Sequence, residues 1–513
     1  MAQSTSPDLA LEGSTIGDLQ ARLRAAELTS AAIVEWYLSR MAGLDRQGPA
    51  LNSVMEINPD APEVAESLDV ERRSGRVRGI LHGIPILLKD NIETADRMQT
   101  TAGSIALWGE PVGRDAFLVG RLRDAGAVIL GKANLSEWAN FRSPHSISGW
   151  SSRGGQTKNP YALDRNPCGS SSGSAVAVAA DLCAGAFGTE TDGSIICPSQ
   201  ANGIVGIKPT VGLISRSGVI PIAHSQDTAG PMARCVADAA ALLGAVTGAD
   251  RADPATRGSA GRALRDYTAF LDPDGLRGAR LGVARDSFGG DARIDKIMER
   301  ALETMKKAGA ELVDVRLPDD DRYGHAELQV LLFEFKADLN AYLASRPAPG
   351  RVRSLDELIA FNEKHRATVM PYFGQERLEL AAKKGPLSSK VYRQAKEKCR
   401  RMTRTEGIDA VIRRQRLDAI VAPAGGPAWE IDLVNGDHHR GLGCTSPAAV
   451  AGYPSITVPA GHIFGLPVGL VFFTHAWGEG VLIRLAYAFE HASRIRRPPR
   501  FLASADLGLP AWE

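Results

Sequence analysis

Apolar residues in the first half of the chain follow two different periods. Between residues 15 and 41 they recur every three or four positions, which predicts helices over 15–24 and 29–41. Beyond Gly83 they gather instead in short runs typical of buried strands, separated by helical patterns. The predicted strands are 84–88, 127–130, 184–188 and 203–207, and the predicted helices are 116–125 and 174–180. This alternation predicts an α/β fold.

The second half continues the alternation around two unusual stretches. Residues 248–278 are rich in Asp-Pro and Gly and predict a long surface connection or a boundary. Residues 326–416 have a mostly helical pattern with several aromatic side chains; such a segment could cover a pocket, although aromatics at helical spacing more often pack in a core. Strand patterns occur at 280–284, 311–315, 419–422, 456–458 and 468–472. We therefore expect these pieces to join one layered sheet.

The charge balance argues against polyanionic partners. Among 513 residues, 60 Lys and Arg face 59 Asp and Glu, so no net field attracts the chain to nucleic acid or to an anionic membrane. The densest basic cluster, residues 396–401, falls in a helical pattern and is interpreted as a solvated helix face. The start of the chain lacks a signal-peptide pattern, and no apolar run is long enough to span a membrane. We expect a cytoplasmic globular protein with no nucleic-acid or membrane partner.

The six cysteines form neither a CxxC pair nor a dense cluster. This spacing favours neither a zinc site nor a disulfide scaffold. Reduced thiols are the expectation for all of them.

Two segments rich in glycine and serine, together with one lysine, are the candidate chemical groups. The segments are Cys168-Gly169-Ser170-Ser171-Ser172-Gly173-Ser174 and Thr191-Asp192-Gly193-Ser194-Ile195, and Lys89 closes the apolar run at 84–88. Glycine lets the backbone aim N–H groups at a developing negative charge, and serine hydroxyls can attack a carbonyl carbon. An apolar site favours the neutral form of a lysine, which can then act as a base. We expect hydrolysis of an acyl bond without a histidine.

These segments resemble the amidase signature family and, within it, the bacterial peptide amidases. The resemblance runs from Gly83-Ile84-Pro85 to Leu466-Pro467-Val468-Gly469, and its most specific parts are Lys89-Asp90-Asn91, residues 167–180, 188–198 and 206–210, and Asp227-Thr228-Ala229-Gly230-Pro231-Met232. It implies the amidase signature fold, a large mixed β-sheet covered by helices on both faces. It also implies a single domain over residues 1–513, with the helical segment at about 326–416 placed to cover the pocket.

The resemblance further implies a Ser-Ser-Lys triad that needs no metal and no organic cofactor. Ser194 matches the nucleophile, Ser170 the serine in a cis peptide, and Lys89 the base. In the implied mechanism Ser194 attacks an amide carbonyl, its proton passes through Ser170 to Lys89, and an acyl-enzyme forms. The oxyanion would be surrounded by backbone N–H groups of Thr191, Asp192, Gly193 and Ser194.

Two positions depart from the wider family. Asp192 stands where many members have glycine, and Ile196 stands where many have arginine. The first change keeps the backbone donor but adds a side chain that can touch substrate. The run from Glu190 to Ser194 nevertheless resembles the peptide-amidase branch.

Other residues compete for these roles. Ser171 and Ser172 are expected to shape the loop rather than relay protons. Cys197 is interpreted as a small buried cysteine rather than a thiol nucleophile. His224 near Asp227 is the best candidate for a Ser-His-Asp arrangement, and ranks below the Ser-Ser-Lys interpretation.

The function that these features predict is amide hydrolysis through a serine acyl-enzyme, with a small-molecule or peptide amide as substrate. The C-terminal carboxamide of a peptide, cleaved with release of ammonia, is the favoured substrate. Two alternatives stay open: an aryl-acylamide or carbamate hydrolase using the same triad, and an A-type subunit of a tRNA-dependent amidotransferase.

Overall fold

The computed structural model describes residues 10–346, 352–440 and 442–508 of the chain. In this part of the chain the main sheet has eleven strands, in the order β1-β3-β2-β6-β8-β7-β12-β13-β11-β9-β10. Their bounds are β1 (Val54–Ile57), β2 (Pro85–Lys89), β3 (Val128–Ala133), β6 (Gly185–Glu190), β7 (Val205–Lys208), β8 (Thr228–Ala233), β9 (Arg280–Ala284), β10 (Glu311–Val315), β11 (Ala419–Pro423), β12 (Ser455–Ile463) and β13 (Leu466–Phe473). A separate short hairpin pairs β4 (Trp150–Ser151) with β5 (Gly155–Gln156).

The sheet is mixed, and its parallel pairs lie in two groups. Strand β2 runs parallel to β3 and β6, and β9 runs parallel to β10 and β11. The central strands β8, β7, β12 and β13 pair antiparallel. The predicted α/β class with one large mixed sheet is therefore confirmed.

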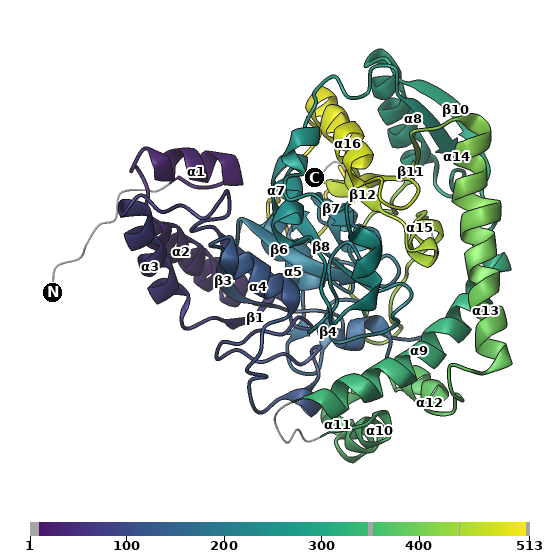
Figure 1. Ribbon diagram of the computed structural model, residues 1–513, viewed down its shortest axis with the longest axis horizontal. Coiled ribbons are helices and arrows are strands. Elements are labelled where there is room, and N and C mark those ends of the chain that lie inside the picture. The colour runs from purple at the N-terminus through teal and green to yellow at the C-terminus, as the bar shows by residue number, and fades with distance from the viewer. Residues whose placement is uncertain (1–9, 347–351, 441, 509–513) are drawn as a thin grey trace, which may run out of the picture.

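Helices pack against this sheet and around it (Figure 1). Their bounds are α1 (Ile16–Arg24), α2 (Ser30–Arg40), α3 (Ala61–Arg73), α4 (Phe117–Asp124), α5 (Ser172–Ala179), α6 (Ile196–Ala201), α7 (Val236–Val246), α8 (Ala292–Lys307), α9 (Gly324–Ser345), α10 (Leu355–Lys364), α11 (Arg366–Val369), α12 (Glu376–Ala382), α13 (Lys390–Arg400), α14 (Asp409–Gln415), α15 (Ser446–Ala451) and α16 (Glu479–Ser493). The predicted connection at 248–278 contains two short 3₁₀ turns, at Pro254–Ser259 and Thr268–Phe270.

Both faces of the sheet are covered, as the alternation of side chains along β13 shows. Leu470 and Phe472 belong to one apolar cluster with residues of α7, α8 and α16. Val471 and Phe473 point the opposite way and belong to another cluster with residues of α14 and α15. Because successive strand residues face opposite sides, this division places a helical layer on each side.

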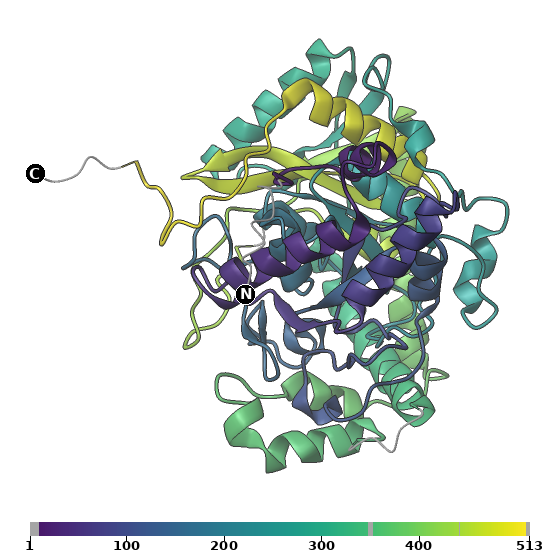
Figure 2. The same ribbon diagram turned by 90° about the vertical axis from the view of Figure 1, so that its left-hand side faces the viewer.

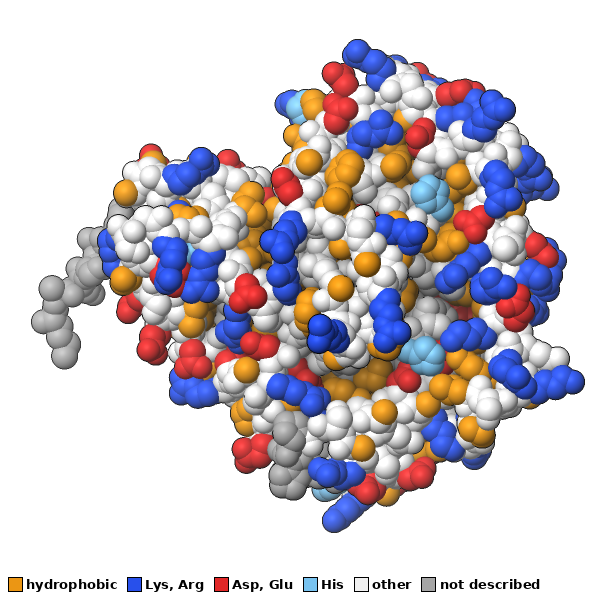
Figure 3. Space-filling model, viewed as in Figure 1, with side chains coloured by type: hydrophobic (Ala, Val, Ile, Leu, Met, Phe, Trp, Pro, Cys, Tyr) orange, Lys and Arg blue, Asp and Glu red, His pale blue; other side chains and the backbone are white. Residues whose placement is uncertain are grey.

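The helical segment predicted at 326–416 is present and runs along the margin of the molecule. Helices α9 to α14 follow one another along the lower and right margins of Figure 1, and the turned view in Figure 2 shows α10 to α12 gathered at the bottom. Charged side chains of both signs are spread over the face shown in Figure 3. Among the described residues, none of the helices combines the length and apolar character that crossing a membrane requires.

One expectation is wrong: the cysteines are not all reduced. Cys168 and Cys197 form a disulfide across a separation of 29 residues. The other four, Cys183, Cys235, Cys399 and Cys444, are free. Sequence spacing could not reveal the pair, because the fold brings together two segments that are neither adjacent nor arranged in a repeated pattern.

Candidate active site

The carboxyl ends of two parallel strands place Lys89 next to Thr189. Strand β2 ends at Lys89, its neighbour β6 ends at Glu190, and the two strands are in register from Ile86 and Gly185 onward. Parallel strands end at the same edge of a sheet, which is where α/β folds commonly bind ligands. The loop with Ser170 meets this edge because α5, which follows it, packs on β2 and β6.

Lys89 is fully buried and surrounded by oxygen atoms. Its Nζ donates to Ser170 Oγ at 2.8 Å, to Thr189 Oγ1 at 2.9 Å, and to Ser171 Oγ and the Thr189 carbonyl at 3.1 Å each. Burial lowers the pKa of Lys89 to about 7, against the smaller opposing effects of the Glu190 and Asp227 carboxylates. The amine is therefore neutral in a large part of the molecules near neutral pH.

The serine loop is held in a close-packed backbone path. The peptide bond between Gly169 and Ser170 is cis, as the resemblance implied. A Cβ on Gly169 would lie 2.3 Å from Ser136 Oγ, and one on Gly173 would lie 2.2 Å from the Ser53 carbonyl oxygen, so neither position has room for a side chain. The serines next to Ser170 bond to the backbone: Ser171 Oγ to the Thr189 amide and carbonyl, and Ser172 Oγ to the Cys168 carbonyl. These contacts agree with the loop-shaping role predicted for Ser171 and Ser172.

The second loop presents free backbone donors beside Ser194. In the described part of the chain, the N–H groups of Thr191, Asp192, Gly193 and Ser194 donate no hydrogen bond. Gly193 adopts φ +76°, a left-handed conformation that glycine accepts without strain. The loop is anchored behind these donors, because Glu190 Oε2 accepts from the amides of Ile195 and Ile196 at 2.7 and 3.0 Å. The four donors predicted for the oxyanion are thus unpaired and lie in one short segment.

A cavity of about 420 Å³ opens in front of Ser194. Ser194 is 9% exposed, and within the described residues its Oγ makes no hydrogen bond, whereas Ser170 is fully buried behind it. The Ser194 carbonyl accepts from the Ser171 amide at 3.1 Å, which ties the two loops together. The lining is partly apolar and partly charged and consists of Ala139, Asn140, Phe141, Gly169, Thr191, Asp192, Ser194, Ile222, Gly324, Glu327, Leu328, Leu331 and Arg377.

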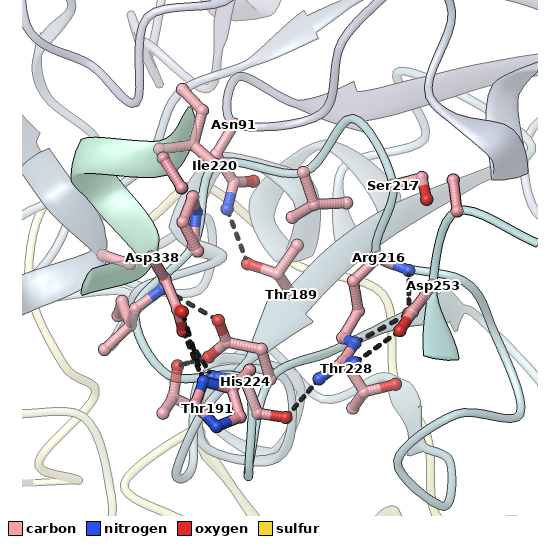
Figure 4. Close-up of a pocket in the computed structure, with 17 residues that line it drawn as sticks. Asn91, Thr189, Thr191, Arg216, Ser217, Ile220, His224, Thr228, Asp253 and Asp338 are labelled. Atoms are coloured by element: carbon pink, nitrogen blue, oxygen red, sulfur yellow. Dashed lines mark hydrogen bonds and ion pairs between the residues drawn. The ribbon is translucent and has the colours of Figure 1, made fainter. Parts of the chain in front are cut away.

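A second cavity, of about 330 Å³, shares Ala139, Thr191 and Ile222 with the first and is lined by His224 (Figure 4). His224 Nδ1 lies 2.9 Å from Asp338 Oδ2, and its Nε2 lies 3.2 Å from Glu334 Oε1. Asp227 bonds instead to Thr191 Oγ1, at 2.6 Å. The structure therefore does not join His224 and Asp227 into a Ser-His-Asp arrangement.

His224, Glu334 and Asp338 are also close enough together to be considered as metal ligands. Lys396 Nζ, however, lies 3.0 Å from Glu334 Oε1 and 3.4 Å from His224 Nε2. A lysine ammonium inside the group already supplies the positive charge that the two carboxylates need, so the group is better described as an ion-pair network than as a metal site.

Sequence reasoning gave no role to several residues that shape the site. Glu190 anchors the oxyanion loop, and Asp227 positions Thr191 while also accepting from the amides of Ile222 and Ala223. Asn91 donates to Thr189 Oγ1, the atom that also contacts Lys89. Asn91 and Asp227 belong to the motifs Lys89-Asp90-Asn91 and Asp227 to Met232, which marked both residues in the sequence. The motifs did not indicate which atoms these side chains contact.

Comparison with known proteins identifies the family of the chain. The Amidase family model matches residues 32–483. The chain is 42% identical to a probable amidase of Arabidopsis thaliana, over 97% of this chain and 93% of that protein. It is 34% identical to the A-type subunit of the glutamyl-tRNA(Gln) amidotransferase of Symbiobacterium thermophilum, over 92% of this chain and 95% of that one.

Solved structures show the same fold. The peptide amidase PAM in complex with the competitive inhibitor chymostatin is 55% identical, with a TM-score of 0.93 over 96% of this chain and 99% of that one. The native peptide amidase of Stenotrophomonas maltophilia is 54% identical, with a TM-score of 0.90 over the same shares. The chain belongs to the amidase family and has the amidase signature fold. It is an amide-hydrolysing enzyme.

Proposed function

We propose that the chain is a peptide amidase, which removes ammonia from the C-terminal carboxamide of a peptide and leaves internal peptide bonds intact. The observation that carries the proposal is the contact of a buried, easily deprotonated Lys89 with Ser170, directly behind a cavity that opens on Ser194. The apolar lining suits peptide side chains, and the polar Asn140 and Arg377 can bond to peptide carbonyl oxygens. The similarity to the two peptide amidases supports the substrate class.

In this mechanism Ser194 Oγ attacks the carboxamide carbon. Its proton passes to Ser170 Oγ while the proton of Ser170 passes to neutral Lys89. The free amides of residues 191–194 stabilise the oxyanion, and the ammonium of Lys89 returns a proton through Ser170 to the leaving NH₂ group. Water then attacks the acyl-enzyme by the same relay and releases the peptide acid. Because Ser194 Oγ makes no hydrogen bond in the described structure, its bond to Ser170 has to form when substrate binds.

We also propose a domain organisation for the chain and a position for its helical segment. Residues 1–513 are proposed to form a single domain, a view supported by a sheet whose strands come from both halves of the chain. The helical segment is proposed to cover the pocket, because Glu327, Leu328 and Leu331 of α9 and Arg377 of α12 line the cavity at Ser194. A cytoplasmic location stays a prediction, and the Cys168–Cys197 disulfide is more typical of oxidising compartments.

The proposal is tested by measuring ammonia release from a panel of peptide amides and from free glutamine, with aniline release from anilides measured beside it. Wild type should turn over peptide amides, and Ser194→Ala and Lys89→Ala should lose more than about 100-fold in kcat. His224→Gln serves as a control that removes the best histidine candidate without touching the triad. A preference for anilides would favour the aryl-acylamide alternative, and activity restricted to glutamine would favour the amidotransferase alternative. Full activity of Ser194→Ala would overturn the mechanism.

A further inference from the structure

Two carboxyl side chains stand in the wall of the cavity that contains Ser194. Asp192 comes from the oxyanion loop, two residues before Ser194, and Glu327 comes from the first turn of α9. Both are only partly exposed, and both line the same cavity. The mechanism proposed above uses neither side chain.

Each carboxyl group is held in place by a hydrogen bond from another side chain of the protein. Thr445 Oγ1 donates to Asp192 Oδ1 at 3.0 Å, from the residue that precedes α15. Gln226 Nε2 donates to Glu327 Oε1 at 2.9 Å and to the Thr191 carbonyl at 3.3 Å. Gln226 therefore links α9 to the oxyanion loop. Because each carboxyl oxygen has two lone pairs, both groups keep acceptor capacity toward the cavity.

The two carboxyl groups are also close enough to influence each other's protonation. Burial raises the pKa of Glu327 to about 8, with the neighbouring Asp192 carboxylate and a hydrogen bond to it as further causes. Burial and the Glu190 carboxylate raise the pKa of Asp192 to about 6, against hydrogen bonds from Ser446 and Thr445. Two carboxyl groups can share a hydrogen bond only if one holds the proton, so near neutral pH Glu327 is the acid and Asp192 the carboxylate.

We propose that Asp192 and Glu327 form the subsite that accepts the N–H groups of the substrate's terminal carboxamide, and so distinguish a peptide amide from a peptide acid. The inference rests on the proposed function and adds a specificity-determining pair to it. A carboxamide bound with its oxygen at the backbone donors of residues 191–194 has its nitrogen about 2.3 Å from that oxygen, within reach of a side chain on the same loop. Asp192 is the one member of those four residues that carries a carboxylate.

The chemistry of substrate and product differs at the atom that this pair would contact. The amide presents an NH₂ group with two donors, whereas the acid product presents a second oxygen with no donor and a negative charge. The pair carries a negative charge and therefore attracts the N–H donors of the substrate and repels the carboxylate of the product. The same repulsion would hasten product release after the acyl-enzyme is hydrolysed. A glycine in place of Asp192 would leave only the bare backbone at this point, with no side chain to tell the two apart.

The test measures the preference for amide over acid. Glycyl-phenylalanine amide and glycyl-phenylalanine are titrated into the Ser194→Ala protein by calorimetry, alone and combined with Asp192→Asn or Glu327→Gln. We expect the ratio of the two affinities to fall at least about 10-fold in the Asp192→Asn combination, mainly because the acid binds more tightly once a carboxamide donor replaces the carboxylate. The fall should be smaller in the Glu327→Gln combination, because Glu327 already holds a proton near neutral pH and the substitution removes no charge. In the active enzyme, inhibition by the acid product should strengthen by a similar factor.

The control variant is Asp320→Asn. Asp320 is a neighbouring carboxyl group that contributes to the pKa values of both members of the pair, but it does not line the cavity and instead accepts from the Tyr323 hydroxyl. Asp320→Asn should leave the ratio of amide to acid affinity unchanged. An equal fall of this ratio in Asp320→Asn would show that the loss of any nearby negative charge causes the effect, and would contradict the inference. If wild type releases ammonia from peptide amides while Asp192→Asn and Glu327→Gln keep the wild-type ratio, this inference is wrong and the proposed function stands. If wild type releases no ammonia from any amide, the proposed function fails first.

Discussion

Cys168 and Cys197 join the two loops that carry the candidate catalytic serines. The disulfide lies two residues before Ser170 and three residues after Ser194. The hydrogen bond from the Ser171 amide to the Ser194 carbonyl connects the same two segments on the side of the cavity. A proton relay between Ser194 and Ser170 depends on the distance between two separate loops, and the disulfide fixes that distance covalently from outside the reacting groups.

Removing this disulfide should lower stability more than activity. For a closed loop of 29 residues the chain-entropy model gives about 3–4 kcal/mol, so Cys168→Ala combined with Cys197→Ala should reduce the free energy of unfolding by a value of this order. Denaturant titration measures it, and kcat should fall less than about 10-fold because the Ser171–Ser194 hydrogen bond remains. Thiol titration of the unfolded wild type should count four thiols without reductant and six with it. A count of six in both conditions would show that the bond is not formed.

The pH dependence of kcat/KM should report the protonation of Lys89. The neutral amine is the base, and the pKa of Lys89 is lowered to about 7, so activity should rise with pH through this region and then level off. The Glu190 carboxylate raises that pKa, and Glu190→Gln removes the charge while keeping an acceptor for the amides of Ile195 and Ile196. The rising limb should therefore move to lower pH in Glu190→Gln. A limb that stays at its wild-type position would contradict the assignment to Lys89.

Lys89→Met should make the protein more stable at pH 7 while removing activity. The pKa of Lys89 is lower in the folded protein than in the unfolded chain, so between about pH 7 and 10.5 the unfolded chain binds more protons. Burying this lysine therefore lowers the free energy of unfolding by the largest amount below about pH 7. This destabilisation declines as pH rises toward 10.5, where the unfolded lysine is also half neutral. We expect a gain of about 1–4 kcal/mol at pH 7 that shrinks by about pH 10, measured as the difference in unfolding free energy between variant and wild type. An equal gain at both pH values would indicate a packing effect instead.

Much of the fold could be predicted from periodicity. The strands β9 and β10 begin and end at the predicted residues, and β2, β3, β11 and β13 differ by a few positions at most. Strand β8 could not be predicted, because Gly230 and Pro231 interrupt the pattern that strands normally show. Its ladder to β7 covers only Met232 and Ala233, so Pro231 is not required to donate to that strand. Tertiary pairing on both sides overrides the local sequence there.

The site was predictable to the extent that its residues belong to motifs. The glycine-rich loops and the lysine at a strand end marked the region, and the resemblance to the amidase signature family then assigned Lys89, Ser170 and Ser194 to the triad; their roles stay predictions. Glu327 could not be named, since an acidic residue on a helix is normally a solvated one, and only the fold brings it to Asp192. The same holds for Cys168 and Cys197, whose pairing depends on two loops meeting.

Ser170 and Ser171 both contact Lys89. Substituting each serine should show which one transfers the proton and which one only holds the loop in place. Ser170→Ala removes the hydroxyl that we place between Ser194 and Lys89, so kcat should fall by about 100-fold or more with little change in stability. Ser171→Ala removes an acceptor for the Thr189 amide and a donor to its carbonyl in a buried position, which should cost about 1–3 kcal/mol of stability and less activity. Ser172→Ala is the matched control, because its hydroxyl bonds to the Cys168 carbonyl and not to Lys89. Measuring kcat and unfolding free energy for all three variants decides the roles: a larger loss of kcat in Ser171→Ala than in Ser170→Ala would transfer the relay to Ser171.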